Sequence, residues 1–200
     1  MAAGDPPVHA PPVDSLGAAA VARRLDNPAA AAVRRLDGAA AAAAVPALAE
    51  LLIDCVHSGA SVSFMAPLPV ARARTFWHQV ADGVARGERA LLVAEDDSGI
   101  VGTVQLILDM PDNQPHRADV AKMLVLQRAR RRGIAQRLLS AVDEVARHEK
   151  RRVLVLDTVT GSDAERLYVR QGWQRVGEVP HFALMPDGAP CPTTFFYRLL

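Results

Sequence analysis

The sequence predicts one α/β (α+β) domain in which helices flank a central mixed, twisted sheet, and three observations support this prediction. Half of the 200 residues are apolar, which suffices for one sizeable core. Residues 90–108 alternate with a period of two about the turn 96–99, as an antiparallel hairpin does. The nearly continuous apolar run 153–156 follows a strand and an amphipathic helix, which is typical of a parallel strand reached by a crossover.

The remaining elements follow from apolar spacing and from glycines that end helices. The expected order is two helices, three strands, a helix, a strand, a helix and two strands. The expected helices are 46–56, 67–87, one beginning near 132, and 162–170, and the expected strands are 90–94, 100–108, 120–126, 153–156, 173–179 and 194–200.

The first part of the chain differs in composition from the rest. Residues 1–42 are rich in alanine and proline and are expected to form a flexible N-terminal segment, followed by a domain over 43–200. The segments 22–26 and 33–37 nearly repeat each other, which indicates either a short helical duplication or compositional bias.

Charge and cysteine content exclude several classes of protein. The 23 basic and 22 acidic residues give a net charge of +1, so nucleic acid or an anionic membrane is not an expected partner. Cys55 and Cys191 are too few for a disulfide framework and have no metal-ligand spacing, so no metal is expected. No run reaches about 18 apolar residues, and no signal peptide is evident, so a cytoplasmic protein is expected.

The stretch 127–135, rich in arginine, lies between a predicted strand and a predicted helix. Free N–H groups at a helix start favour a phosphate, Gly133 and Ala135 allow close approach, and Arg130 to Arg132 add charge. A solvated basic turn or a nucleic-acid patch is the alternative interpretation. The stretch lacks the signatures of a P-loop and of a dinucleotide fold, so a different pyrophosphate ligand is indicated.

Two ordered motifs resemble the GNAT superfamily of N-acetyltransferases. Arg130-Arg-Arg-Gly-Ile-Ala135 resembles its coenzyme A loop, Arg/Gln-x-x-Gly-x-Gly/Ala. Ala164-Glu-Arg-Leu-Tyr-Val-Arg-Gln-Gly-Trp173 resembles its Ala-x-x-Leu-Tyr-x-x-x-Gly-Phe segment, with Trp in place of Phe. The resemblance covers 88–200 as the core and 46–87 as substrate-facing helices. It implies a mostly antiparallel sheet with splayed parallel strands at the cofactor site, and acetyl-CoA as co-substrate.

The resemblance also implies a set of cofactor-binding residues. The backbone of the strand before the loop bonds the pantetheine arm, and the loop holds the pyrophosphate. Many members carry an asparagine where Gly161 stands, and Ser162 is a candidate substitute for it. The cofactor candidates are Met123, Leu124, Val125, Arg130, Arg131, Arg132, Gly133, Ile134, Ala135, Gln136, Ser162 and Tyr168.

Transfer of an acetyl group to an amine requires a base, an acid and a donor to the thioester carbonyl. Tyr168 is the candidate acid, since a phenol of pKa about 10 is protonated at neutral pH. Asp119 and Asp157 are candidate bases, and the N–H of Leu124 or Val125 is the candidate carbonyl donor. The alternatives are a core tyrosine, a solvent-exposed Asp119, and an Asp157 that caps the end of its strand.

Shorter phrases, among them Gly59-Ala-Ser-Val and Pro186-Asp-Gly, resemble a branch of the family that acetylates an amino-acid-like toxin. This resemblance implies the reaction but not that substrate. The predicted function is therefore direct transfer from acetyl-CoA to a primary amine of a small, amino-acid-like molecule, such as an antibiotic or toxin, with resistance as the role. The chain is expected to act as a monomer or homodimer. The alternatives are a protein or peptide N-acetyltransferase and a non-catalytic acyl-CoA-binding module. His57, His78 and His181 are expected to be ordinary loop or surface residues.

Overall fold

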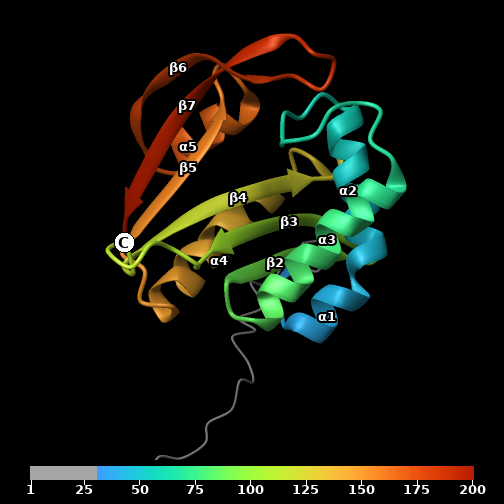
Figure 1. The fold of residues 1–200 in the computed structure, drawn as a ribbon, viewed down its shortest axis with the longest axis horizontal. Helices are drawn as coiled ribbons and strands as arrows, with labels where there is room; N and C mark the ends of the chain where they lie inside the picture. The colour runs from blue at the N-terminus through green and yellow to red at the C-terminus, as the bar shows by residue number, and fades with distance from the viewer. Residues whose placement is uncertain (1–30) are drawn as a thin grey trace, which may run out of the picture.

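The computed structural model describes residues 31–200, which form one seven-stranded sheet with helices on both faces (Figure 1). The strand order is β1-β2-β3-β4-β5-β7-β6. The strands are β1 Ala32–Leu36, β2 Arg89–Asp96, β3 Gly99–Ile107, β4 Arg117–Val125, β5 Val153–Val159, β6 Gln174–Leu184 and β7 Pro190–Leu199. The helices are α1 Gly38–Ala43, α2 Val45–His57, α3 Val70–Ala85, the 3₁₀ turn η1 Gln127–Ala129, α4 Ile134–His148 and α5 Asp163–Arg170.

The sheet separates two cores. Along β2, Leu91 and Val93 point to the core under α1, α2 and α3, whereas Leu92 points to the core under α4. This alternation is the period of two expected of a strand that is covered on both faces. Tyr168 of α5 and Trp173 join the core on the α4 side, so α4 and α5 share one face of the sheet.

The predicted hairpin and the predicted parallel pair are both confirmed. β2 and β3 are antiparallel, and β4 and β5 are the only parallel pair among the described strands. The sheet is therefore mixed and mostly antiparallel, as predicted.

The N-terminal boundary needs correction, because the structure includes residues 31–42 in the fold. β1 pairs antiparallel with β2, and the Asp37 side chain caps α1 by accepting a hydrogen bond from the Ala40 N–H at 2.8 Å. The alanine-rich composition masked this strand, whose partner lies far away in the sequence. The predicted flexible segment otherwise falls on residues 1–30, which lie outside the described residues.

β4 and β5 diverge soon after they meet. They pair only at Arg117–Val153, Ala118–Leu154 and Asp119–Val155. Farther along, a bulge interrupts the pairing of β4 with β3, and within it Lys122 adopts the left-handed conformation with φ of 51°. Figure 1 shows β5, β7 and β6 turned away from β2, β3 and β4. One edge of the C-terminal half of β4 is thus left without a strand partner.

Candidate active site

The arginine-rich loop begins where β4 ends and leads through η1 into α4. At its start, the Asp54 carboxylate of α2 accepts a hydrogen bond from the Gln127 N–H at 2.8 Å. At the end of the loop, Ile134 packs closely on Gly102 of β3. A Cβ added to Gly102 would lie 3.0 Å from Cγ2 of Ile134. The loop is therefore held at both ends by the helix and the strand beside it.

The backbone of the loop suits an anion. Gly133 precedes α4 with φ of 76°, and Arg131 also has a positive φ, of 61°. The helix starts without a side-chain cap, so its first N–H groups are available to a ligand. A Cβ on Gly133 would meet nothing within 4 Å, so its conformation, rather than space, requires glycine. Ala135 and Gln136 lie in this first turn.

The arginines of the loop point in different directions. Arg132 pairs with Asp96 of the β2–β3 turn at 3.2 Å, and Arg128 donates to Ser98 Oγ of the same turn at 2.8 Å. Arg130 donates through Nε to the Val125 carbonyl at 3.2 Å. The charges of Arg131 and Arg130, after the stronger effect of Arg166, help to lower the pKa of Asp163 at the start of α5. Arg130 also interacts with the Cys55 thiol of α2, so its charge acts toward α2 as well as toward α5.

The strand residues predicted to hold the cofactor lie on the part of β4 that has no strand partner on the β5 side. Leu124 and Val125 pair with Thr103 and Gly102 of β3 on one side, while β5 has moved away on the other. The side chains of Leu124 and Ile134 are buried in the cores. Only the backbones of Leu124 and Ile134 can therefore contact a ligand in the opening, which is the gap between the diverging strands β4 and β5. Met123 precedes Leu124 in β4.

Ser162, the predicted substitute for an asparagine, caps α5. Its Oγ accepts a hydrogen bond from the Glu165 N–H at 3.1 Å. The neighbouring Gly161 N–H donates to the Glu165 carboxylate, so Ser162 and Glu165 cap the helix reciprocally. The hydroxyl hydrogen of Ser162 is the part of this side chain that remains for a ligand.

Tyr168 lies in the core beside the opening. Its ring packs edge-on against Trp173 at 5.8 Å and lies 6.1 Å from Phe196, centroid to centroid. Burial, and then the negative charge of Asp157, raises the pKa of its phenol well above the usual value. The ring thus has the packing of a core tyrosine, and the hydroxyl stays protonated near Asp157.

Asp157, at the open end of β5, is the electrostatic centre of the candidate site. Partial enclosure raises the pKa of this carboxyl, Lys122 opposes the increase, and Asp119 adds to it. Asp119 occupies the last paired position of β4 and forms an ion pair with Arg117. Asp157 therefore lies within electrostatic range of both Asp119 and Tyr168.

Lys122 was not among the predicted site residues, and its side chain contacts Ser63 and the Phe76 ring of α3. Its Nζ donates to Ser63 Oγ at 3.0 Å and lies 5.8 Å from the centre of the Phe76 ring. Burial lowers the pKa of Lys122, and Asp157 opposes this shift. A lysine inside the apolar run 120–126 was the available signal, because charged residues are seldom placed inside covered strands.

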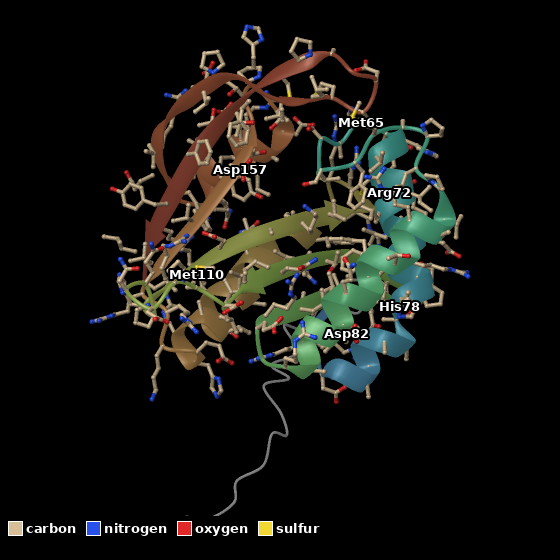
Figure 2. All side chains as sticks on the ribbon, in the orientation of Figure 1. Met65, Arg72, His78, Asp82, Met110 and Asp157 are labelled. Atoms are coloured by element: carbon tan, nitrogen blue, oxygen red, sulfur yellow. The ribbon has the colours of Figure 1, made fainter. Side chains whose placement is uncertain are left out.

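Two segments that are far apart in the sequence are hydrogen-bonded to each other. The Ser61 hydroxyl donates to the Leu184 carbonyl at 2.8 Å, and the Ala66 N–H donates to the Pro186 carbonyl at 2.9 Å. A pocket of about 240 Å³ lies between the end of α2 and the β6–β7 hairpin. Figure 2 shows Asp157 on the β5 arm and Met65 and Arg72 on the facing helical side.

The histidines do not enter the candidate catalytic set. His57 Nε2 accepts a hydrogen bond from the Leu68 N–H at 3.2 Å, while His78 and His181 are exposed. Within residues 31–200, no group of three metal-ligating side chains comes together. No helix in that same part of the chain has the length and apolarity to cross a membrane.

The fold and the site define a class of α/β proteins whose mixed sheet opens between two parallel strands beside a helix that starts without a side-chain cap. One known family matches part of the chain. Residues 87–175 match the model of the acetyltransferase (GNAT) domain. This segment is therefore similar to the acetyltransferase (GNAT) domain, in agreement with the resemblance that its motifs predicted.

Individual relatives agree with this assignment. An uncharacterized N-acetyltransferase of Azospirillum brasilense, encoded in the hisH–hisA intergenic region, is 34% identical over 112 residues, which are 55% of this chain and 65% of that protein. The match thus spans slightly less than two thirds of that relative.

Solved structures share the fold. A GCN5-related N-acetyltransferase of Kribbella flavida has a TM-score of 0.70 at 24% identity, covering 87% of this chain and 100% of that one. A putative acetyltransferase of Salmonella typhimurium, solved with its cofactor acetyl-CoA, has a TM-score of 0.69 at 18% identity, covering 86% and 94%.

Proposed function

We propose that this protein is an N-acetyltransferase that moves an acetyl group from acetyl-CoA to a primary amine of a small, amino-acid-like molecule. One observation supports this most strongly. The only parallel pair among the described strands opens directly after Asp119, with the arginine-rich loop on one side and Asp157 and Tyr168 at the opening. A thioester threaded along the free edge of β4 would reach these groups.

The loop and the free strand edge fit acetyl-CoA, here a co-substrate. The N–H groups of Gly133 to Gln136 and the charges of Arg130 and Arg131 suit a pyrophosphate. The unpaired edge at 123–125 suits the amide groups of a pantetheine arm. The fold shared with a structure that contains acetyl-CoA supports the same co-substrate.

The groups at the opening suit a direct transfer. Asp157, whose pKa is raised, would accept a proton from the acceptor ammonium, and the free amine would attack the thioester carbon. The N–H of Leu124 or Val125 would polarise the carbonyl oxygen. As the C–N bond forms and the C–S bond breaks, Tyr168 would give its proton to the departing thiolate. Cys55 and Cys191 are buried, which does not favour a covalent acetyl-enzyme.

The amine acceptor would enter on the side of the opening that faces segment 61–66, here called the acceptor side. This side is partly covered, which favours a small molecule over a polypeptide. The segment 61–66 is hydrogen-bonded to the β6–β7 hairpin, which restricts access from that side. The phrases Gly59-Ala-Ser-Val and Pro186-Asp-Gly, from the two segments that meet here, resemble the tabtoxin resistance protein, a GNAT member that acetylates an amino-acid-like toxin. This contact supports an acceptor of similar size, with resistance as one role.

The test is amine-dependent release of thiol from acetyl-CoA. The panel should contain free amino acids, simple amines and peptides, with the acetylated product identified by mass spectrometry. The proposal predicts turnover of small acceptors and none of peptides. Turnover of peptides alone would establish a peptide N-acetyltransferase, and tight acetyl-CoA binding without any thiol release would establish a non-catalytic module.

A further inference from the structure

The acceptor side of the opening carries two opposite charges, Lys122 and Asp157, that do not form an ion pair with each other. Lys122 interacts electrostatically with Asp157, yet in residues 31–200 no carboxylate forms an ion pair with Lys122. Its Nζ is held by Ser63 Oγ at 3.0 Å instead. Two unpaired charges that attract each other across an opening are complementary to a ligand that carries both charges.

The wall around Lys122 is aromatic and cationic. Phe64 and Phe76 pack edge-on at 5.3 Å, Lys122 Nζ lies 5.8 Å from the Phe76 centroid, and Arg72 lies 5.7 Å from that of Phe64. These contacts hold the ammonium of Lys122 in place by cation–π attraction and a hydrogen bond. An ammonium held in place and partly removed from water is a good anchor for a carboxylate, because the bond is charge-assisted.

The backbone of Lys122 also has an uncommon conformation. Lys122 is a non-glycine residue with φ of 51°, inside the bulge of β4. Such a conformation is costly for a side-chain-bearing residue, and bulges commonly redirect a side chain beside a site. Here the bulge coincides with a lysine whose Nζ contacts Ser63, and Lys122 follows shortly after Asp119, the last residue of β4 that pairs with β5.

We propose that Lys122 determines acceptor specificity by binding the carboxylate of a zwitterionic, α-amino-acid-like acceptor whose ammonium group faces Asp157. The proposal rests on the proposed acetyl transfer and adds a recognition residue to it. With the carboxylate on Lys122, the acceptor nitrogen is directed to Asp157, where it loses its proton before attack. An acceptor that lacks the carboxylate loses this anchor but keeps the base.

The experiment compares L-α-amino acids with their amides as acceptors, for the wild type and for Lys122→Met. The wild type should prefer the acids. Lys122→Met should lower kcat/KM for the acids about ten- to hundredfold, mainly through KM, because a hydrogen bond between charged groups is lost. On the plateau of the pH profiles, where Asp157 is ionised in both proteins, the values for the amides and the KM for acetyl-CoA should stay nearly unchanged. Lys122→Arg should restore part of the preference.

Lys150→Met is the matched control, because Lys150 is the other lysine of the chain and is exposed beyond α4. It should behave as the wild type. Equal losses for acids and amides in Lys122→Met, or an undiminished preference for acids, would overturn the proposal while leaving acetyl transfer intact. Turnover of simple amines but of no amino acid would also overturn it. Absence of thiol release with every amine would instead refute the proposed function on which it rests.

Discussion

The Asp54 carboxylate accepts a hydrogen bond from the Gln127 N–H at 2.8 Å and thereby ties α2 to the start of the arginine-rich loop. The two residues are 73 positions apart in the sequence. The contact connects the helical side that faces the acceptor to the loop proposed to bind pyrophosphate. Asp54 is therefore a positioning residue, although it adds a negative charge near an anion site.

Removal of this contact should weaken the use of acetyl-CoA. Asp54→Ala should raise the KM for acetyl-CoA several-fold with a smaller change in kcat, because a charge-assisted hydrogen bond that positions the loop is lost. Asp54→Asn, which keeps an acceptor oxygen, should have a smaller effect. Glu50→Ala, at an exposed position of the same helix, is the control. An unchanged KM in Asp54→Ala would show that the loop does not depend on the contact.

Tyr168→Phe tests the proposed acid. The variant should lose about a hundredfold in kcat, the lower end of what general acid catalysis contributes, while its KM for acetyl-CoA stays close to that of the wild type. Because the ring keeps its packing on Trp173, the fold should persist, which circular dichroism can check. Tyr197→Phe removes the other tyrosine hydroxyl, on β7, and should retain full activity. Full turnover by Tyr168→Phe would disprove the role.

The pH profile of kcat/KM tests the proposed base. A base acts unprotonated, so activity should fall as the pH drops through the pKa of Asp157, which is raised above the usual aspartate value. The positive charge of Lys122 favours the ionised carboxylate, so Lys122→Met should move this acid limb to higher pH, measured with an amide acceptor. Asp157→Asn should abolish the limb together with most activity. An acid limb that is unaffected by Lys122→Met would place the base elsewhere.

An ion pair between Arg198 and Asp143 joins β7 to α4. Arg198 Nη2 lies 2.9 Å from Asp143 Oδ2, and burial raises the pKa of Asp143 while Arg198 opposes the increase. Arg198→Met should lower the free energy of unfolding by about 3–5 kcal/mol at neutral pH, since it leaves a buried charge without its partner.

The pH dependence of that loss has a definite sign. Because the folded-state pKa of Asp143 lies above its unfolded value, the penalty is present at neutral pH and is relieved as the pH falls through the folded pKa. The gap between Arg198→Met and wild type, measured by urea unfolding, should therefore narrow at lower pH. Arg86→Met, at an exposed ion pair, should change little. A gap that widens on acidification would contradict this account.

The sequence predicted what is local in the chain. The hairpin 89–107 and the loop around Gly133 have periodicity or motifs within a few residues, and both appear as predicted. β1 was missed because this short segment, Ala-Val-Arg-Arg-Leu, stands in alanine-rich surroundings and pairs with β2, far along the chain. The contact between Lys122 and Ser63 was missed because it depends on a bulge and on the path of a loop, which residue spacing does not encode.

Calorimetric titration with acetyl-CoA is the most direct test of the central claim that the loop before α4 holds this co-substrate. The wild type should bind with a Kd between about 1 μM and 1 mM, the usual range for substrates. Gly133→Val should weaken binding at least about tenfold, because a β-branched residue is strained at φ of 76°. Gly177→Val, at a glycine of β6 with open space and no positive φ, should bind as the wild type. A wild-type protein that binds no acetyl-CoA, or a Gly133→Val variant that binds it equally well, would contradict the account.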